Sequence, residues 1–233
     1  MAMAARTVAV LGASGGVGSA VVKKALANGF KVRALARSKS KAMAALGDEA
    51  FGQLDAFIEG DVSDASALAA LLKDGGDEHP VVMSCLGTPK GMAPCVESGT
   101  RFLMDAMALR GWKRLVMISS IGVGDSLEQG RGMAPIFIRC IVPCFLSKVF
   151  GDLERAEELC WTERGGVKCV AVRPPALTDK PGRGNFTLAS ASDPRPSKTA
   201  KIPREDVAAA MVQLADPTAF GQWAGKGVTV VVP

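Results

Sequence analysis

Short apolar runs alternate along the chain with longer segments in which apolar residues recur at helical spacing. The first run covers residues 7–12 and ends in glycine, which is typical of a strand buried in a parallel sheet. Valine and alanine then recur at helical spacing from Val17 to Ala25, and Asn28-Gly29 ends this segment. The pattern predicts a strand followed directly by a helix.

The same alternation continues to the other end of the sequence. Further strands are predicted at residues 31–36, 56–59, 81–85, 114–119, 168–173 and 228–232. Further helices are predicted at 39–46, 64–72, 95–110, 153–164 and 204–215. Strands that alternate with helices of about ten residues form a parallel sheet covered on both faces. The predicted fold class is therefore α/β, with a doubly wound, mainly parallel, Rossmann-like sheet in a single domain over residues 1–233.

Two long connections rich in Gly, Pro and Ser interrupt this rhythm, at about residues 121–151 and 174–203. Ligands of open α/β sheets bind outside the carboxyl ends of the strands, and long loops there are usually functional. We therefore expect both connections to act as substrate loops. The apolar segment from Met133 to Phe150 is either a wall for an apolar substrate or a helix packed on the sheet edge.

A glycine-rich loop stands between the first strand and the first helix. A tight turn at Gly12, close approach of backbone N–H groups to a pyrophosphate at Gly15 and close helix-sheet contact at Gly18 would meet the needs of a dinucleotide site. The predicted cofactor-binding residues here are Gly12, Ser14, Gly15, Gly16, Val17 and Gly18. The alternative is a plain strand-to-helix turn, but the strand before and the helix after the loop favour the dinucleotide.

The end of the second strand indicates which dinucleotide binds. NAD sites place a carboxylate about 20 residues beyond the glycines. This chain has Arg37 there, followed by Lys39 and Lys41, and no Asp or Glu between Val32 and Gly47. Because guanidinium and ammonium groups suit a 2′-phosphate, NADP(H) is the predicted cofactor, against the alternative of a solvated basic turn.

After the third strand, Asp61 and Val62 offer a second contact to the cofactor. The Asp61 carboxylate would accept a hydrogen bond from the adenine amino group, and the next backbone N–H would donate to the ring. The alternative is that Asp61 simply ends the strand.

The amino-acid composition argues against several classes of catalytic and metal site. The chain has no tyrosine and a single histidine, His79, which argues against serine hydrolases and His-rich metal sites, and no metal site is predicted. The net charge of +5 is spread without a run of five or more like charges, and only 5% of residues are aromatic. A mildly basic, solvated surface with no nucleic-acid partner is therefore expected.

The six cysteines form no CxxC pair and have no histidine at ligand spacing. We expect free thiols of a reducing compartment, most of them packed as small hydrophobes, with Cys140 and Cys144 in the core rather than on a metal. No targeting segment is expected before Thr7, and charges and a proline break the apolar segment that ends at Phe150. The predicted location is cytoplasmic, with no membrane partner.

Taken together, the motifs resemble those of atypical short-chain dehydrogenases/reductases, and most closely the NAD(P)H-binding group that includes biliverdin IXβ reductase, also known as flavin reductase. The segments that carry the resemblance occur in the expected order over nearly the whole chain: Gly12 to Gly18, Gly60 to Val62, Ser84 to Thr88, Arg114 to Ser120 and Val172 to Asp179.

The resemblance implies several further contacts to the cofactor. Arg37 and Lys41 would hold the 2′-phosphate, and Ser119 and Ser120 would lie near the nicotinamide. Residues that would run beside the cofactor or pass next to the nicotinamide are Leu86, Gly87, Thr88, Pro174, Pro175, Ala176 and Leu177. Residues 180–187 would help to close the pocket.

Two departures from the family pattern bear on mechanism. Most short-chain dehydrogenases use a Tyr-x-x-x-Lys pair to protonate a carbonyl, and this chain has no tyrosine. A histidine follows the Pro-Pro pair in biliverdin IXβ reductase, and Ala176 stands at that position here. Carbonyl reduction is therefore disfavoured, and a bilin as the physiological substrate is in doubt.

The sequence favours hydride transfer from NADPH to a conjugated acceptor of flavin, bilin or quinone type, because such acceptors need no positioned general acid. Ser120 is the predicted catalytic residue, unless it only caps the strand end. Lys148 and Arg155 are further candidates at the pocket rim. The alternative function is a non-catalytic NADP-binding redox sensor or scaffold. The expected partner is a small-molecule acceptor, and the expected state is a monomer or weak homodimer.

Overall fold

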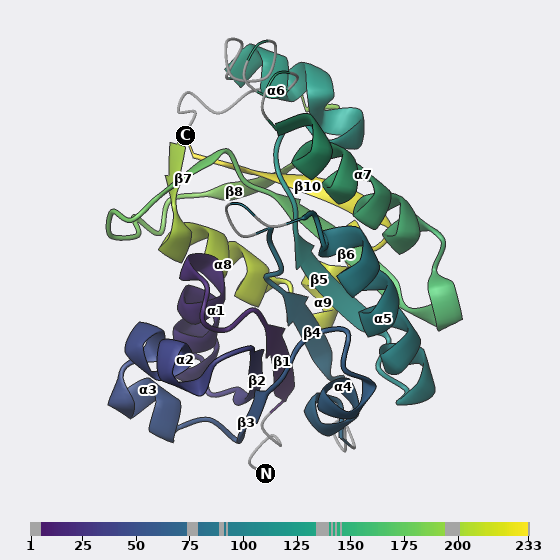
Figure 1. The fold of residues 1–233 in the computed structure, drawn as a ribbon. Helices are drawn as coiled ribbons and strands as arrows, with labels where there is room; N and C mark the ends of the chain where they lie inside the picture. Colours follow the sequence, from purple (N-terminus) through teal and green to yellow (C-terminus); the bar gives the residue numbers. More distant parts are fainter. Residues whose placement is uncertain are drawn as a thin grey trace.

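The computed structural model describes residues 6–73, 79–88, 91, 93–133, 140, 142, 144, 146–193 and 201–232. A sheet of eight strands crosses this part of the chain in the order β3-β2-β1-β4-β5-β6-β10-β8, all parallel to their neighbours except β8 (Figure 1). The strands are β1 Thr7–Leu11, β2 Lys31–Ala36, β3 Ala56–Glu59, β4 Val81–Ser84, β5 Arg114–Ile118, β6 Lys168–Arg173, β8 Thr187–Ser190 and β10 Lys226–Val231. The prediction of a doubly wound, mainly parallel sheet is confirmed.

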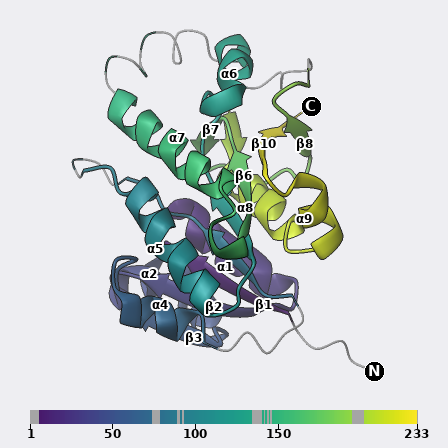
Figure 2. The same ribbon diagram turned by 90° about the vertical axis from the view of Figure 1, so that its right-hand side faces the viewer.

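Helices cover both faces of the sheet (Figure 2). One face packs against α1 Gly16–Ala27, α2 Lys39–Leu46, α8 Arg204–Gln213 and α9 Pro217–Trp223. The other face packs against α4 Ala65–Leu71, α5 Val96–Leu109 and α7 Ser147–Trp161. Val8 and Val10 of β1 point into the first core, and Ala9 and Leu11 into the second. A strand buried on both sides explains why these segments are apolar without alternation.

The chain reverses its direction of travel across the sheet between β1 and β4. It leaves β1 toward β2 and β3 and then returns to the other side of β1. Gly12, directly after β1, has a φ of +76°, and a Cβ there would lie 2.6 Å from the carbonyl oxygen of Cys85, directly after β4. Only glycine fits this close approach, and ligands of such sheets bind where the strand order reverses.

Both long connections contain more regular structure than the sequence pattern predicts. The first carries a short turn at Gly124–Ser126, α6 Leu127–Met133 and the start of α7, which begins before the predicted 153 and ends at Trp161. The second carries β7 Ala176–Thr178, which pairs in parallel with β9 Lys201–Pro203, and it also contains β8. Much of the apolar segment from Met133 to Phe150 lies outside the described residues.

Two short helices were also missing from the predicted elements, α3 Asp48–Gly52 and α9. The start of α9 has a recognisable signal. Asp216 caps it by accepting hydrogen bonds from the backbone N–H groups of Thr218 and Ala219, and Pro217 occupies the first turn.

The cysteines are free thiols, but they are less uniformly buried than expected. Cys160 and Cys169 are buried, whereas Cys140 and Cys144 are exposed. The prediction that Cys140 and Cys144 pack in the core is wrong, because both side chains, which precede α7 in the sequence, are open to solvent. No helix among the described residues is long and apolar enough to cross a membrane.

A buried ion cluster ties the first long connection to the sheet. Arg173, at the end of β6, is 1% exposed. Its guanidinium donates to both carboxylate oxygens of Glu157 on α7, at 3.0 and 2.5 Å, and also to Asp125 in the turn before α6. Gly227 on β10 leaves room for the Arg173 guanidinium, because a Cβ at this residue would overlap it. Three separate segments are thus joined by one charged group.

Replacement Glu157→Gln should lower the free energy of unfolding by about 3–5 kcal/mol, because it leaves the buried Arg173 charge without its main counter-charge. Urea denaturation of the purified protein measures this value. Glu158→Gln, on the exposed side of the same helix, is the matched control. Equal losses for the two variants would contradict the buried pairing.

Candidate functional site

The glycine loop follows β1 and leads directly into α1. The backbone N–H of Gly15 donates to the Gly12 carbonyl at 2.9 Å and closes a tight turn. A Cβ at Gly18 would overlap the Gly12 carbonyl, so the first turn of α1 lies directly against the loop. The N–H groups of Gly12 and Ala13 donate to the Leu35 carbonyl of β2, which fixes the loop at the sheet edge.

The N-terminus of α1 presents backbone donors without a side-chain cap. Gly15 is the N-cap residue and has no side chain that could cap the helix, and the first turn contains no acidic residue. Gly15 and Gly16 are exposed, Ser14 is half-buried, and Val17 and Gly18 are buried. An exposed helix N-terminus with free N–H groups attracts anions such as a pyrophosphate.

The basic turn lies at the end of β2, as the spacing predicts. Arg37 and Lys41 are exposed. Ser38 caps α2 by accepting from the Lys41 N–H at 3.3 Å, and the Lys39 N–H donates to Glu59 at 3.1 Å. The Lys39 ammonium lies 6.0 Å from the centre of the Phe51 ring. Sequence spacing did not indicate Glu59, which reaches this turn from the end of β3.

Asp61 lies close to this basic turn. Its Oδ1 accepts from the Ser63 backbone N–H at 3.0 Å and from the Ser63 hydroxyl at 2.8 Å. These two bonds, and the neighbouring Arg37 charge, hold the pKa of the Asp61 carboxyl below its usual value. Asp61 therefore remains an anion and a hydrogen-bond acceptor near neutral pH.

Val62 follows β3 and Leu86 follows β4, and both are apolar. Val62 is buried. A Cβ at Gly99 of α5 would lie 3.0 Å from a methyl group of Val62 and 2.9 Å from a methyl group of Leu86, so α5 packs closely against both side chains at this glycine. Gly87 beyond them is exposed.

Two hydroxyls near the ends of β4 and β5 have no hydrogen-bond partner among the described residues. They are Ser119 Oγ, in a residue only 8% exposed, and Thr88 Oγ1. A buried hydroxyl without a partner costs free energy, and such groups often bind a ligand. By contrast, the hydroxyl of Ser120 donates to the Ile121 carbonyl at 3.1 Å.

The segment after β6 lies beside these serines. The Ser119 N–H donates to the Val172 carbonyl at 2.7 Å, and the Ile121 N–H donates to the Pro174 carbonyl at 3.1 Å. Pro174 and Pro175 are buried, Ala176 is exposed and Leu177 is half-buried. The two long connections therefore meet at the carboxyl edge of the sheet.

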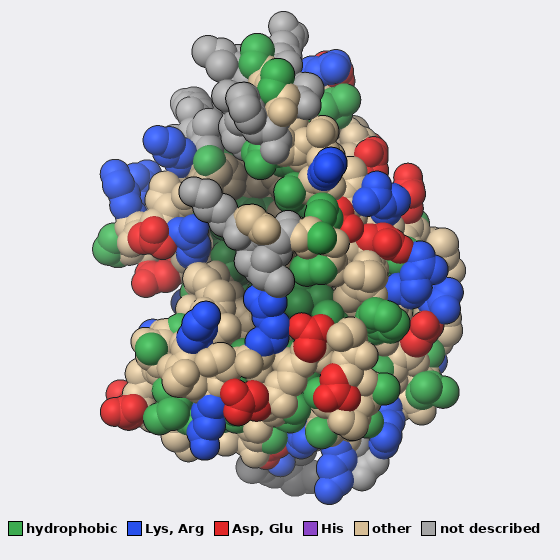
Figure 3. Space-filling model, viewed as in Figure 1, with side chains coloured by type: hydrophobic (Ala, Val, Ile, Leu, Met, Phe, Trp, Pro, Cys, Tyr) green, Lys and Arg blue, Asp and Glu red, His purple; other side chains and the backbone are tan. Residues whose placement is uncertain are grey.

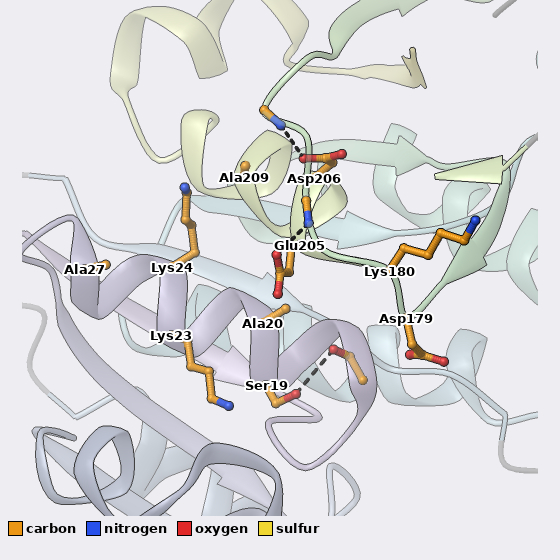
Figure 4. Close-up of a pocket in the computed structure, with 13 residues that line it drawn as sticks. Ser19, Ala20, Lys23, Lys24, Ala27, Asp179, Lys180, Glu205, Asp206 and Ala209 are labelled. Carbon is orange, nitrogen blue, oxygen red and sulfur yellow. Dashed lines mark hydrogen bonds between the residues drawn. The ribbon is translucent and has the colours of Figure 1, made fainter. Parts of the chain in front are cut away.

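The first turn of α8 holds the loop at residues 179–184, a role that the sequence did not reveal. Arg204 pairs with Asp179 at 2.5 Å. Glu205 accepts from the Gly182 N–H at 2.7 Å (Figure 4). The buried Asp206 accepts from the N–H groups of Arg183 and Gly184 at about 2.9 Å. Acidic residues in a first helical turn are common, so they gave no specific signal.

A groove of about 460 Å³ is lined by this loop, α1 and α8. Lys23 and Lys24 contribute to its α1 wall, and Glu205 extends into it from α8 (Figure 4). The face shown in Figure 3 is hollowed at its left edge, where α1 and α8 lie in Figure 1. Gly16, at the end of the glycine loop, also lines this groove.

His79, Lys148 and Arg155 lie away from the carboxyl ends of the strands. His79 precedes β4 at the amino edge of the sheet, where its carbonyl accepts from Arg114. Lys148 is exposed at the start of α7. Arg155 lies 3.8 Å from Asp152, a buried carboxylate that caps α5 by accepting from the Val96 N–H at 2.8 Å.

The residues at the carboxyl edge fit a dinucleotide. The glycine loop leaves space that side chains would fill, and the N-cap residue of α1 has no capping side chain. Within the described part of the chain, the hydroxyls of Ser119 and Thr88 have no hydrogen-bond partner. The N-terminus of α1 thus provides donors for phosphates, and the hydroxyls after β4 and β5 provide donors for the polar groups of a ligand.

Known proteins resemble this chain in sequence and in fold. Residues 12–217 match the family described as NAD(P)H-binding. Among curated proteins, the oxidoreductase claK of Passalora fulva is 26% identical over 96% of this chain and 83% of its own length.

Solved structures with the same fold include ChuY, an anaerobillin reductase from Escherichia coli O157:H7, with a TM-score of 0.76, 23% identity and 97% of each chain covered. A wide-type short-chain dehydrogenase/reductase from Veillonella parvula, in complex with NADP, has a TM-score of 0.77 at 13% identity, covering 98% of this chain and 95% of its own.

Proposed function

Because the chain belongs to the NAD(P)H-binding family, we propose that it is an NADPH-dependent reductase that transfers hydride to a conjugated acceptor of flavin, bilin or quinone type. The nicotinamide cofactor supplies the hydride, and the chain holds it against the acceptor. The curated relative named as an oxidoreductase, and the anaerobillin reductase with the same fold, support this class of reaction.

In this proposal the carboxyl edge of the sheet binds the cofactor along its length. The N-terminus of α1 binds the diphosphate, Arg37 and Lys41 bind the 2′-phosphate, and Asp61 with Val62 faces the adenine. The residues assigned to the nicotinamide half are Leu86, Gly87, Thr88, Ser119, Pro174, Pro175, Ala176 and Leu177. Residues 121–151 and 174–203 are the proposed substrate loops, and Ser120 is the proposed contact to the acceptor.

The observation that carries the choice of acceptor is that the described carboxyl edge of the sheet has neither a phenol nor an imidazole that could act as a general acid. The sequence has no tyrosine, and its one imidazole, His79, lies at the amino edge of the sheet. Burial raises the pKa of the Cys85 thiol, next to Gly12, to about 12. A conjugated acceptor spreads the incoming charge over its π-system and takes its proton from water, so it needs no such acid.

The test is turnover by the purified protein. NADPH with FMN, or with dichlorophenolindophenol, should lose its absorbance faster than in the uncatalysed reaction under anaerobic conditions. NADPH binding is measured in parallel by its fluorescence. Binding without any turnover would overturn the reductase and favour a non-catalytic NADP-binding sensor or scaffold.

Replacement Arg37→Asp should weaken NADPH binding by at least about tenfold, because it removes a charge-assisted contact to the 2′-phosphate and adds a negative charge. NADH lacks that phosphate and should bind almost as before. Lys31→Asp, at the opposite end of the same strand, makes the same charge change and should spare both cofactors. An unchanged ratio of NADPH to NADH affinity in Arg37→Asp would refute the assignment.

The two neighbouring serines should have separate effects. Ser120→Ala should slow turnover by about threefold to tenfold with little change in NADPH affinity, because one hydrogen bond to the acceptor is lost. Ser119→Ala should weaken NADPH binding itself. Steady-state kinetics and fluorescence titration measure the two effects, and an unaltered rate for Ser120→Ala would leave that residue purely structural.

A further inference from the structure

Arg204, the first residue of α8, lies directly against the glycine loop. A Cβ on Gly16 would lie 2.8 Å from both Cδ and Nε of Arg204 and 3.6 Å from its Cζ. The guanidinium is thus beside the uncapped first turn of α1. Nothing in the sequence spacing connects Arg204 with Gly16, because the two residues come from opposite ends of the chain.

The neighbouring structure holds Arg204 in this place. Ile202 of β9 is fully buried, and β9 pairs with β7 directly before α8 begins. The only salt bridge found for Arg204 in the described part of the chain is the one to Asp179, whose side chain is 90% exposed. An exposed carboxylate is a weak partner, because water screens the pair. The arginine is therefore well positioned and only weakly neutralised.

From this geometry we infer that Arg204 binds the diphosphate of the cofactor and that Asp179 is its resting counter-ion in the free protein. The inference rests on the proposed NADPH site and adds a residue to it. A helix N-terminus supplies partial positive charge through its N–H groups, and a guanidinium beside it supplies a full charge with bidentate donors.

The ion pair between Arg204 and Asp179 also connects the diphosphate site to a loop. It lies at the start of the loop at residues 179–184, which Glu205 and Asp206 fasten to α8 through backbone N–H groups. Arg204 therefore stands between the diphosphate and the loop that follows β7. Bound diphosphate competes with Asp179 for the guanidinium and repels its carboxylate, so cofactor and loop are coupled.

The test compares three ligands by titration: NADPH, 2′-phospho-ADP-ribose and 2′-AMP. Arg204→Ala should weaken the first two by about tenfold to a hundredfold, the range expected for a lost charge-assisted contact. It should change the affinity for 2′-AMP, which has no diphosphate, by less than about twofold. Arg204→Lys should recover part of the loss, because the charge remains but the bidentate donors do not.

Two further variants sharpen the result. Asp179→Asn should bind NADPH more tightly, by up to about fivefold, because an exposed ion pair contributes at most about 1 kcal/mol. Arg183→Ala removes one exposed positive charge from the same loop and should leave all three affinities unchanged. Thermal unfolding without ligand shows that each variant folds.

The outcomes are distinguishable. Unchanged affinity for 2′-phospho-ADP-ribose in folded Arg204→Ala overturns the inference, and so does an equal loss for 2′-AMP or weaker NADPH binding by Asp179→Asn. If the unmodified protein binds none of the three ligands, the proposed NADPH site itself fails.

Discussion

The carboxyl edge of the sheet depends on how closely β1 and β4 approach each other where they end. Gly12 and Cys85 bring two backbones to a separation that no side chain at residue 12 would allow. This contact sets the start of the glycine loop, and Gly18 then lets α1 pack against the carbonyl of Gly12. The position of the N-terminus of α1 at this edge follows from this packing.

Two charged anchors position the long connections around that edge. The buried Arg173, with Glu157 and Asp125, fastens the connection after β5 to β6 and α7. The first turn of α8 fastens the connection after β7, with Asp206 buried beneath its backbone N–H groups. Both anchors use carboxylates with satisfied partners, which is how a loop of polar backbone can be held in place without a large apolar core.

The chemistry available at this edge is limited by what the chain lacks. Hydroxyls and backbone donors are present, but a phenol is missing from the sequence and the single imidazole lies at the far edge. Such groups can position a ligand through hydrogen bonds, but they have little to offer a carbonyl oxygen that must be protonated during hydride transfer.

The sequence by itself determined the α/β alternation, the glycine loop and the basic residues after β2, because each depends on neighbours close in the chain. Gly12, Gly15 and Gly18 could be assigned because they follow the first strand. Arg37 and Asp61 could be assigned because they follow the second and third strands, although the contacts of all five residues with a cofactor stay predictions. Periodicity missed β7, β9 and the early start of α7, which are fixed by pairing and packing with remote segments. It also placed Cys140 and Cys144 in the core, where the structure does not have them.

Only the tertiary structure decided what surrounds the loop. Asp152 caps α5 from a helix 56 residues away in sequence, Glu59 reaches the basic turn from β3, and Arg204 reaches Gly16 from the other end of the chain. An exposed arginine or a first-turn carboxylate looks the same in a sequence whether or not it has such a partner. Local patterns specify elements, but contacts between distant residues exist only once the sheet has brought its strand ends to one edge.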